Sequence, residues 1–212
     1  MTKAPPFRVV DSRRPFQGKV LTVRTDRIVD DDGRTSEREV VEHNGAVGAL
    51  VVDDDGQVVL VDQWRHAVGA RVLEVAAGKY DVDGETVEHA LRRELAEELR
   101  VEGGSLTFLA TFYTTPGWSD EVLDLYLAEG VRPIEGDAPA ADWEEQGIEV
   151  VRLPFEEALA RAAGPPGDAK TLVALGLYGL KLAGSWTPGQ ADRPPPDAPA
   201  RRAARRAARR PA

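Results

Sequence analysis

Three carboxylates in one predicted helix are the residues of this sequence best placed to do chemistry. The segment TVEHALRRELAEELRV, residues 86–101, carries apolar side chains at helical spacing. The apolar stripe consists of Val87, Leu91 and Val101. Glu94 and Glu98 fall on this stripe four residues apart, and Glu97 lies one step round the helix. Like charges at this spacing cost a solvated helix about 0.2–0.5 kcal/mol, and burying them without partners costs several kcal/mol. We therefore expect these carboxylates to converge on divalent cations.

A solvated acidic helix is the alternative, because most runs of charge face water. The apolar stripe argues against it, since the stripe fixes Glu94 and Glu98 on the inward side of the helix. The chain has no Cys and only three His, which excludes thiolate ligands and disfavours an all-His zinc site. Its many acids favour a hard cation bound by oxygen ligands.

Around this helix the sequence resembles the signature of the Nudix hydrolases. That signature is Gly, five residues, Glu, seven residues, Arg-Glu, an aliphatic residue, any residue, Glu-Glu, any residue, Gly and an aliphatic residue. The matching residues are Gly78, Glu85, Arg93, Glu94, Leu95, Glu97, Glu98 and Val101. Two positions depart from it: six residues separate Gly78 from Glu85, and Arg100 stands where the family has Gly. A residue other than Gly costs about 1 kcal/mol in that left-handed helix end. Because Gly103 and Gly104 follow, we expect the helix to end slightly later.

Motifs that flank the signature resemble the ADP-ribose pyrophosphatase branch of this family, over about residues 19–183. These motifs are residues 39–43 with 45–47, 63–66, 74–78, 115–121 and 168–171. The resemblance implies attack of water on one phosphorus of a nucleoside diphosphate joined to another group. For ADP-ribose the products would be AMP and ribose 5-phosphate. Another nucleotide sugar, a dinucleotide, or a non-catalytic nucleotide-sensing domain are the alternatives. The complete set of signature acids argues against the sensing domain.

The resemblance also implies a metal and the residues that hold it. The expected metal is Mg²⁺, with Mn²⁺ as the alternative. Its expected ligands are Glu94, Glu97, Glu98 and the backbone carbonyl of Ala77. The residues expected to be structural in the signature are Gly78, Glu85 and Arg93. Arg93 can fork onto a carboxylate and lock the preceding loop against the helix. The alternative for Glu85 is a first-turn acid that interacts with the helix dipole.

The general base in this branch often comes from a separate loop between the last strands. Here that loop is residues 137–147, and we choose Glu145 as the base, followed by Glu144. Glu97 is the catalytic candidate within the helix itself. A solvated acidic loop is the alternative for the first two residues.

Four further residues are expected to bind the substrate. Arg65 is expected to contact phosphate or the terminal ribose. Trp64 is expected to stack on the base, with a core aromatic at a strand end as the alternative. Trp118 and Glu121, in the loop that begins Thr-Pro-Gly, are expected to shape the substrate pocket.

The elements that position these residues follow from hydrophobic patterning. Strands are expected at 20–24, 38–43, 46–52, 57–63, 73–76, 106–113, 122–128 and 147–153, and further helices at 155–163 and 169–183. This order indicates an α+β fold with a mixed central sheet, and the resemblance implies the Nudix α/β/α sandwich preceded by a small N-terminal antiparallel sheet. Residues 1–18 are expected to be a loose lead-in, 19–185 the domain with its hairpin at about 19–43, and 186–212 a disordered tail. The resemblance implies a homodimer that exchanges the N-terminal sheet.

The charge of the chain is unevenly distributed. The net charge is −9, but the last 24 residues carry seven Arg and two Asp, which leaves the rest at −14. An acidic body disfavours nucleic acid as a partner, except through the Arg-rich tail, and permits a phosphorylated substrate whose charge a metal neutralises. The sequence contains no run of eighteen apolar residues and no apolar leader, so we expect a cytoplasmic protein without membrane contact.

Overall fold

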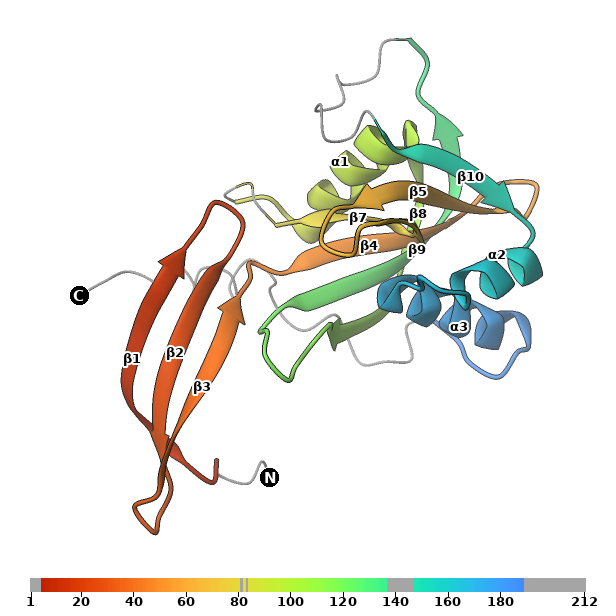
Figure 1. Ribbon diagram of the computed structural model, residues 1–212. Coiled ribbons are helices and arrows are strands. Elements are labelled where there is room, and N and C mark those ends of the chain that lie inside the picture. The colour runs from red at the N-terminus through yellow and green to blue at the C-terminus, as the bar shows by residue number, and fades with distance from the viewer. Residues whose placement is uncertain (1–4, 81, 83, 137–146, 189–212) are drawn as a thin grey trace.

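A three-stranded antiparallel sheet at the N-terminus stands to one side of the main body (Figure 1). The computed structural model describes residues 5–80, 82, 84–136 and 147–188. The strands of this first sheet, in the order β1-β2-β3, are β1 (Arg8–Gln17), β2 (Thr22–Val29) and β3 (Thr35–Glu42). The β2–β3 pair has the antiparallel register expected of the predicted hairpin, with Thr22 opposite Glu42.

The expectation of a loose lead-in over residues 1–18 is wrong, because strand β1 occupies most of that segment. Its side chains are almost all exposed on both faces, so the sequence shows no alternation of apolar and polar residues. Pro15 lies where the register between β1 and β2 shifts, between Arg13 and Phe16. An edge strand tolerates such a residue because one of its edges needs no hydrogen bonds.

The central sheet has seven strands and is mixed, as expected. Its strands are β4 (Ala46–Val52), β5 (Val58–Arg65), β6 (Ala70–Glu74), β7 (Ala76–Lys79), β8 (Val101–Tyr113), β9 (Val122–Pro133) and β10 (Glu149–Leu153). The main path runs β10-β5-β4-β9-β8, while β6 pairs with β5 and β7 with β4. Strand β4 is buried at every residue and pairs in parallel with β9. A continuous apolar run is typical of a strand covered on both faces.

Helices cover both faces of this sheet, which makes the body an α/β/α sandwich (Figure 1). The helices are α1 (Val87–Leu99), α2 (Phe155–Ala162) and α3 (Ala169–Leu182). One hydrophobic cluster joins α1 to the sheet through Leu91 and Leu95, and a second joins α2 and α3 through Ala158 and Leu175. Each face of the sheet therefore has its own core.

The two sheets are joined at the turn between β8 and β9. The Val41 N–H donates to the Trp118 carbonyl at 2.8 Å, and the Asp120 N–H donates to the Val41 carbonyl at 3.1 Å. A parallel bridge pairs Val41 with Ser119. This backbone contact seats the N-terminal sheet beside the turn that carries Trp118 and Glu121.

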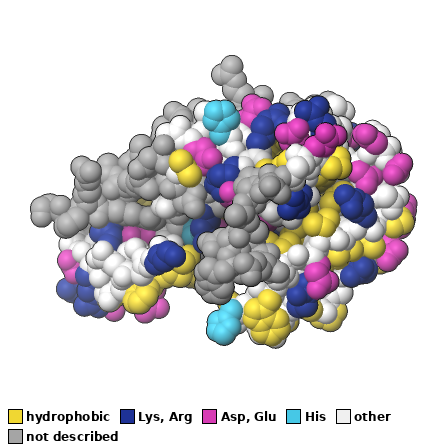
Figure 2. All heavy atoms as spheres, turned by 90° about the horizontal axis from the view of Figure 1, so that it is seen from above, with side chains coloured by type: hydrophobic (Ala, Val, Ile, Leu, Met, Phe, Trp, Pro, Cys, Tyr) yellow, Lys and Arg dark blue, Asp and Glu magenta, His cyan; other side chains and the backbone are white. Residues whose placement is uncertain are grey.

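Trp186 packs against the core cluster of α2 and α3, one residue beyond the expected end of the domain. The Arg-rich tail from residue 189 and the loop with Glu144 and Glu145 lie outside the described residues. Among the helices described, none is both long and apolar enough to span a membrane. Seen from above, acidic and basic side chains are interspersed on the visible face (Figure 2).

Candidate active site

Helix α1 and the strand before it bring the signature residues together. Thr86 caps the helix, because its Oγ1 accepts a hydrogen bond from the His89 N–H at 3.2 Å. The helix ends at Leu99, and Arg100 adopts the left-handed conformation with φ of 57°. The expectation that the helix ends later is wrong: Val101 begins β8, opposite Pro133, so the helix must stop first. Helix α1 therefore ends at the position where the family signature has Gly. In this chain Arg100 occupies that position and adopts the left-handed conformation that Gly would adopt without strain.

Arg93 is the organising cation of the α1 carboxylates. Its guanidinium donates to Glu94 at 2.6 Å, to Glu97 at 3.0 Å and to Glu85 at 3.2 and 3.4 Å. Burial lowers the pKa of Arg93, but its contacts with Glu85 and Glu94 outweigh this effect and raise the pKa above its ordinary value. The charge is therefore permanent. Through Glu85 it ties the loop before the helix to the helix itself.

Gly78 lies directly beneath the Glu94 carboxyl. A Cβ atom at position 78 would overlap the carboxyl carbon and both carboxyl oxygens of Glu94. Only glycine lets the β7 backbone approach this side chain so closely. The Gly at the start of the signature thus makes room for an acid near its end.

Among the described residues, Glu98 is the carboxylate of α1 whose charge no cation compensates by direct contact. It is partly buried, and its Oε2 accepts a hydrogen bond from the Ala77 N–H at 3.0 Å. Among the described residues it forms no ion pair with Arg or Lys. Burial raises the pKa of Glu98 to about 8, with a further contribution from the charge of Glu94. The Ala77 N–H, Arg65 and Lys170 act in the opposite direction.

These carboxylates fit a hard divalent cation by chemistry, although the side chains do not form a ready coordination shell. Within the described ranges, no group of three acids or histidines is positioned to hold a metal. Arg93 instead draws Glu94 and Glu97 to itself. Glu98, however, offers carboxylate oxygens as metal ligands, and no Arg or Lys among the described residues pairs with them. The N–H and C=O of a strand residue share one edge, so the Ala77 carbonyl lies on the side that faces Glu98.

A second charged cluster lies beside the first. Glu74 is only 2% exposed and accepts hydrogen bonds from Arg65 Nε at 2.6 Å and Arg65 Nη2 at 2.7 Å. It also pairs with Lys170 of α3. Burial raises the pKa of Glu74, but Arg65 and Lys170 outweigh it and hold the pKa below its ordinary value. Sequence analysis did not single out Glu74 or Lys170 as functional residues. An acid within the apolar segment 73–76 was the available indication.

The structure separates the other predicted substrate-binding residues. Trp64 is 56% exposed, so the alternative of a core aromatic is wrong. Neighbouring strand residues point to opposite faces, so Trp64 leaves the face on which Arg65 meets Glu74. Glu121 accepts from Thr114 Oγ1 at 2.6 Å and lies 3.3 Å from His43 Nδ1.

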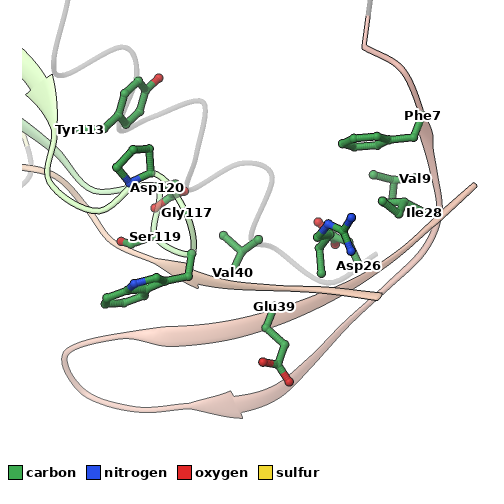
Figure 3. A pocket seen from close by; sticks show the side chains of 13 residues that line it. Phe7, Val9, Asp26, Ile28, Glu39, Val40, Tyr113, Gly117, Ser119 and Asp120 are labelled. Carbon is green, nitrogen blue, oxygen red and sulfur yellow. The ribbon is translucent and has the colours of Figure 1, made fainter. Parts of the chain in front are cut away.

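Trp118 lines a cavity of about 380 Å³ between the N-terminal sheet and the β8–β9 turn (Figure 3). Phe7, Val9 and Tyr113 contribute apolar side chains to the same cavity. Its lining, among residues that the structure describes, contains neither Arg65 nor an acid of α1. The predicted pocket residues therefore fall into separate places on this chain.

Comparison with known proteins identifies the class of protein that this site and fold define. A family model for the NUDIX domain matches residues 42–175, so the chain belongs to the Nudix family. Members of this family generally use a divalent metal. A solved structure described as an ADP compounds hydrolase shares the fold, with a TM-score of 0.73 and 21% identity over 88% of this chain and all of that one.

Curated relatives place the chain more narrowly as a Nudix hydrolase that resembles nucleotide-sugar pyrophosphatases. It is 34% identical over 177 residues to the ADP-ribose pyrophosphatase of Bacillus subtilis. The aligned residues make up 83% of this chain and 94% of that protein. It is also 34% identical over 161 residues to the GDP-mannose pyrophosphatase of Yersinia enterocolitica. This alignment makes up 70% of this chain and 81% of that protein.

Proposed function

We propose that this protein is an Mg²⁺-dependent ADP-ribose pyrophosphatase that releases AMP and ribose 5-phosphate. The observation that carries the proposal is Glu98: a partly buried carboxyl with its pKa raised to about 8, beside Glu94 and without a cation from the described residues in contact. Similarity to a protein named ADP-ribose pyrophosphatase over most of both chains supports the choice of substrate.

Glu94, Glu97, Glu98 and the Ala77 carbonyl are the proposed ligands of Mg²⁺. The bound ion would neutralise charge on the pyrophosphate and acidify a water molecule. Binding requires Arg93 to release Glu94 and Glu97 in part, while Arg93 keeps Glu85. Gly78 leaves the space in which Glu94 can turn. Arg65 supplies a fixed positive charge for a phosphate oxygen, because two of its donors are anchored on Glu74.

We propose Glu145 as the general base that takes a proton from the attacking water, with Glu144 as the alternative. A base acts on the water in the transition state, so Glu145→Gln should lower turnover and leave KM nearly unchanged. Steady-state kinetics on Glu145→Gln and Glu144→Gln decide between the neighbours. Full activity of both variants would place the base elsewhere, with Glu97 as the next candidate.

A panel of nucleoside diphosphate conjugates tests the substrate directly. Each compound is incubated with the protein and Mg²⁺, and the products are separated by chromatography. The proposal expects ADP-ribose to be cleaved with the highest kcat/KM and to give AMP. Preferential cleavage of GDP-mannose would favour the second candidate, which rests on the similarity to a GDP-mannose pyrophosphatase. No cleavage of any conjugate would favour a sensing domain.

We also propose a homodimer formed through the N-terminal sheet. Strand β1 exposes Val9 by 55%, Val10 by 44% and Phe16 by 54%, and a small sheet needs a surface that covers it. Light scattering at micromolar concentration should give twice the mass of the chain. A monomeric mass would contradict this arrangement.

A further inference from the structure

A charged cluster ties the start of helix α3 to the strands beside the proposed metal site. Asp168 caps α3, because its Oδ2 accepts from the Thr171 N–H at 2.9 Å and from Thr171 Oγ1 at 2.6 Å. Its Oδ1 lies 3.1 Å from Lys170 Nζ. Lys170 in turn pairs with Glu74, and Thr171 Oγ1 accepts from the Val75 N–H at 2.8 Å. The first turn of α3 thus holds two successive residues that precede β7.

Glu74 sits between two cations, and this arrangement decides how much charge Arg65 retains. Arg65 commits Nε and Nη2 to Glu74, while its Nη1 has no hydrogen-bond partner among the described residues. Its side chain remains 43% exposed. If Glu74 had only Arg65 as a partner, the pair would be neutral. Lys170 brings a second positive charge, which lies between Glu74 and Asp168. The charges of Arg65, Lys170, Glu74 and Asp168 therefore sum to zero, and the cluster does not repel a further anion that contacts Arg65.

The cluster lies next to the strand that contacts the carboxylates of α1. Glu74 and Val75, which the cluster holds, directly precede strand β7, where the Ala77 N–H donates to Glu98 Oε2 at 3.0 Å. Lys170 itself is only 12% exposed and its amine is held by Glu74 and Asp168. Because its amine is held in this way, Lys170 acts on a bound substrate through Arg65 and does not contact the substrate itself.

We propose that Lys170 is a positioning residue for the diphosphate: it balances the second acid of this cluster, so that Arg65 presents an anchored guanidinium to a phosphate oxygen without a net negative charge beside it. The inference rests on the proposed function and adds a residue to it. Removal of Lys170 leaves Glu74 and Asp168 with Arg65 alone, and the cluster becomes net negative beside an anionic substrate. Ground-state binding should suffer more than the chemical step, since the charge acts on the bound diphosphate in both states.

Two variants remove the charge of Lys170 in different ways. Lys170→Met keeps most of the aliphatic stem, and Lys170→Gln keeps a hydrogen-bond donor, so a folding defect in one leaves the other to be measured. Lys170→Arg restores the charge. Thr171→Val is the matched control, because it removes the hydroxyl that holds Val75 in the same helical turn without a change in charge.

The measurements are KM and kcat for ADP-ribose with Mg²⁺, and Kd for adenosine 5′-(α,β-methylene)diphosphate by calorimetry. We expect Lys170→Met and Lys170→Gln to raise KM and Kd about tenfold while kcat changes less than about threefold. Lys170→Arg should restore both constants. Thr171→Val should lower the melting temperature and leave Kd unchanged.

Unchanged Kd and KM in folded Lys170→Met and Lys170→Gln would overturn the inference and leave the proposed function intact. A wild-type protein that binds the methylene diphosphate with Lys170-dependent affinity, yet hydrolyses no conjugate, would overturn the proposed function and support the inference. A wild-type protein that does not bind this diphosphate would overturn both. An equal rise of Kd in Thr171→Val would reduce Lys170 to a structural role.

Discussion

Glu74 and Glu98 are two acids of the same fold under the influence of the same two cations, and they have opposite surroundings. Glu74 is in direct contact with Arg65 and Lys170, and its pKa lies below the ordinary value. Among the described residues, Glu98 has one backbone N–H for a partner, and its pKa rises to about 8. The first acid has its counter-charge within the chain, and the second is the acid that we propose as the ligand of an external cation. If that proposal holds, the supply of counter-charge, and not burial alone, distinguishes a structural acid from a ligand.

The largest expected effect on this comparison is the loss of stability in Glu74→Gln. Removal of one partner from a buried ion pair leaves Arg65 without its counter-charge and Lys170 with Asp168 alone, and costs about 3–5 kcal/mol. Urea unfolding with EDTA present measures this loss. The control is Glu98→Gln, whose neutral side chain resembles the protonated form already present at neutral pH and keeps an acceptor for the Ala77 N–H. Equal losses in both variants would abolish the contrast between the two acids.

The next largest effect is on turnover. Here Glu98→Gln, the control for stability, is the variant in which we expect the loss. Glu98→Gln removes one proposed oxygen ligand and part of the charge neutralisation in the transition state, so kcat for ADP-ribose should fall at least about a hundredfold. Glu88→Gln is the matched control, because Glu88 lies on the same helix with 62% of its side chain exposed. Near wild-type turnover of Glu98→Gln at limiting Mg²⁺ would contradict the ligand assignment.

The two acids should also give stability opposite dependences on pH. Glu98 has its folded pKa near 8 and an ordinary value of 4.5, so its contribution is complete below pH 4.5 and is lost as pH rises through 8. Glu74 has a lowered folded pKa, so its contribution is present above pH 4.5 and is lost as pH falls. With EDTA present, the wild-type free energy of unfolding should decline from about pH 5 to about pH 8. Urea titrations should show a smaller decline in Glu98→Gln, and an identical decline would count against the raised pKa.

The smallest expected effect is that of Arg100→Gly at the end of α1. Arg100 holds φ of 57°, a conformation that Gly adopts without penalty, so the variant should gain about 1 kcal/mol of stability. Within the part of the chain that the structure describes, the Arg100 side chain makes one exposed hydrogen bond at 3.3 Å, to the Gly136 carbonyl, and its loss should change stability little. Thermal unfolding measures the gain, and kcat should stay unchanged. A destabilised variant would show that Arg100 has a role beyond the helix end.

Periodicity was sufficient to predict the parts of the fold with strong apolar patterns. Strand β4 is a continuous apolar run, and the stripe of α1 predicted the inward direction of its acids. Strand β1 was missed because both its faces are exposed and the sequence therefore carries no pattern. The end of α1 was misplaced because pairing of Val101 in β8 decides it.

Contacts between distant residues could not be predicted from the sequence. Lys170 and Glu74 are 96 positions apart, and only the packing of α3 on the sheet brings them together. Arg93 was expected to fork onto a carboxylate, but its simultaneous hold on three acids depends on the path of the loop before the helix. The sequence therefore predicted the acids of the candidate site together with Arg93 and Arg65, but not which acids these cations contact.

Direct measurement of metal binding tests the central claim, that Glu98 is an acid left for an external cation. Wild type, Glu98→Gln and Glu88→Gln are each titrated with Mn²⁺ at constant pH. Electron paramagnetic resonance measures the concentration of free Mn²⁺, from which the bound fraction follows. The account predicts specific Mn²⁺ binding by wild type and Glu88→Gln, competed by Mg²⁺, and at least about tenfold weaker binding by Glu98→Gln. The same affinity and number of sites in Glu98→Gln as in wild type would contradict it.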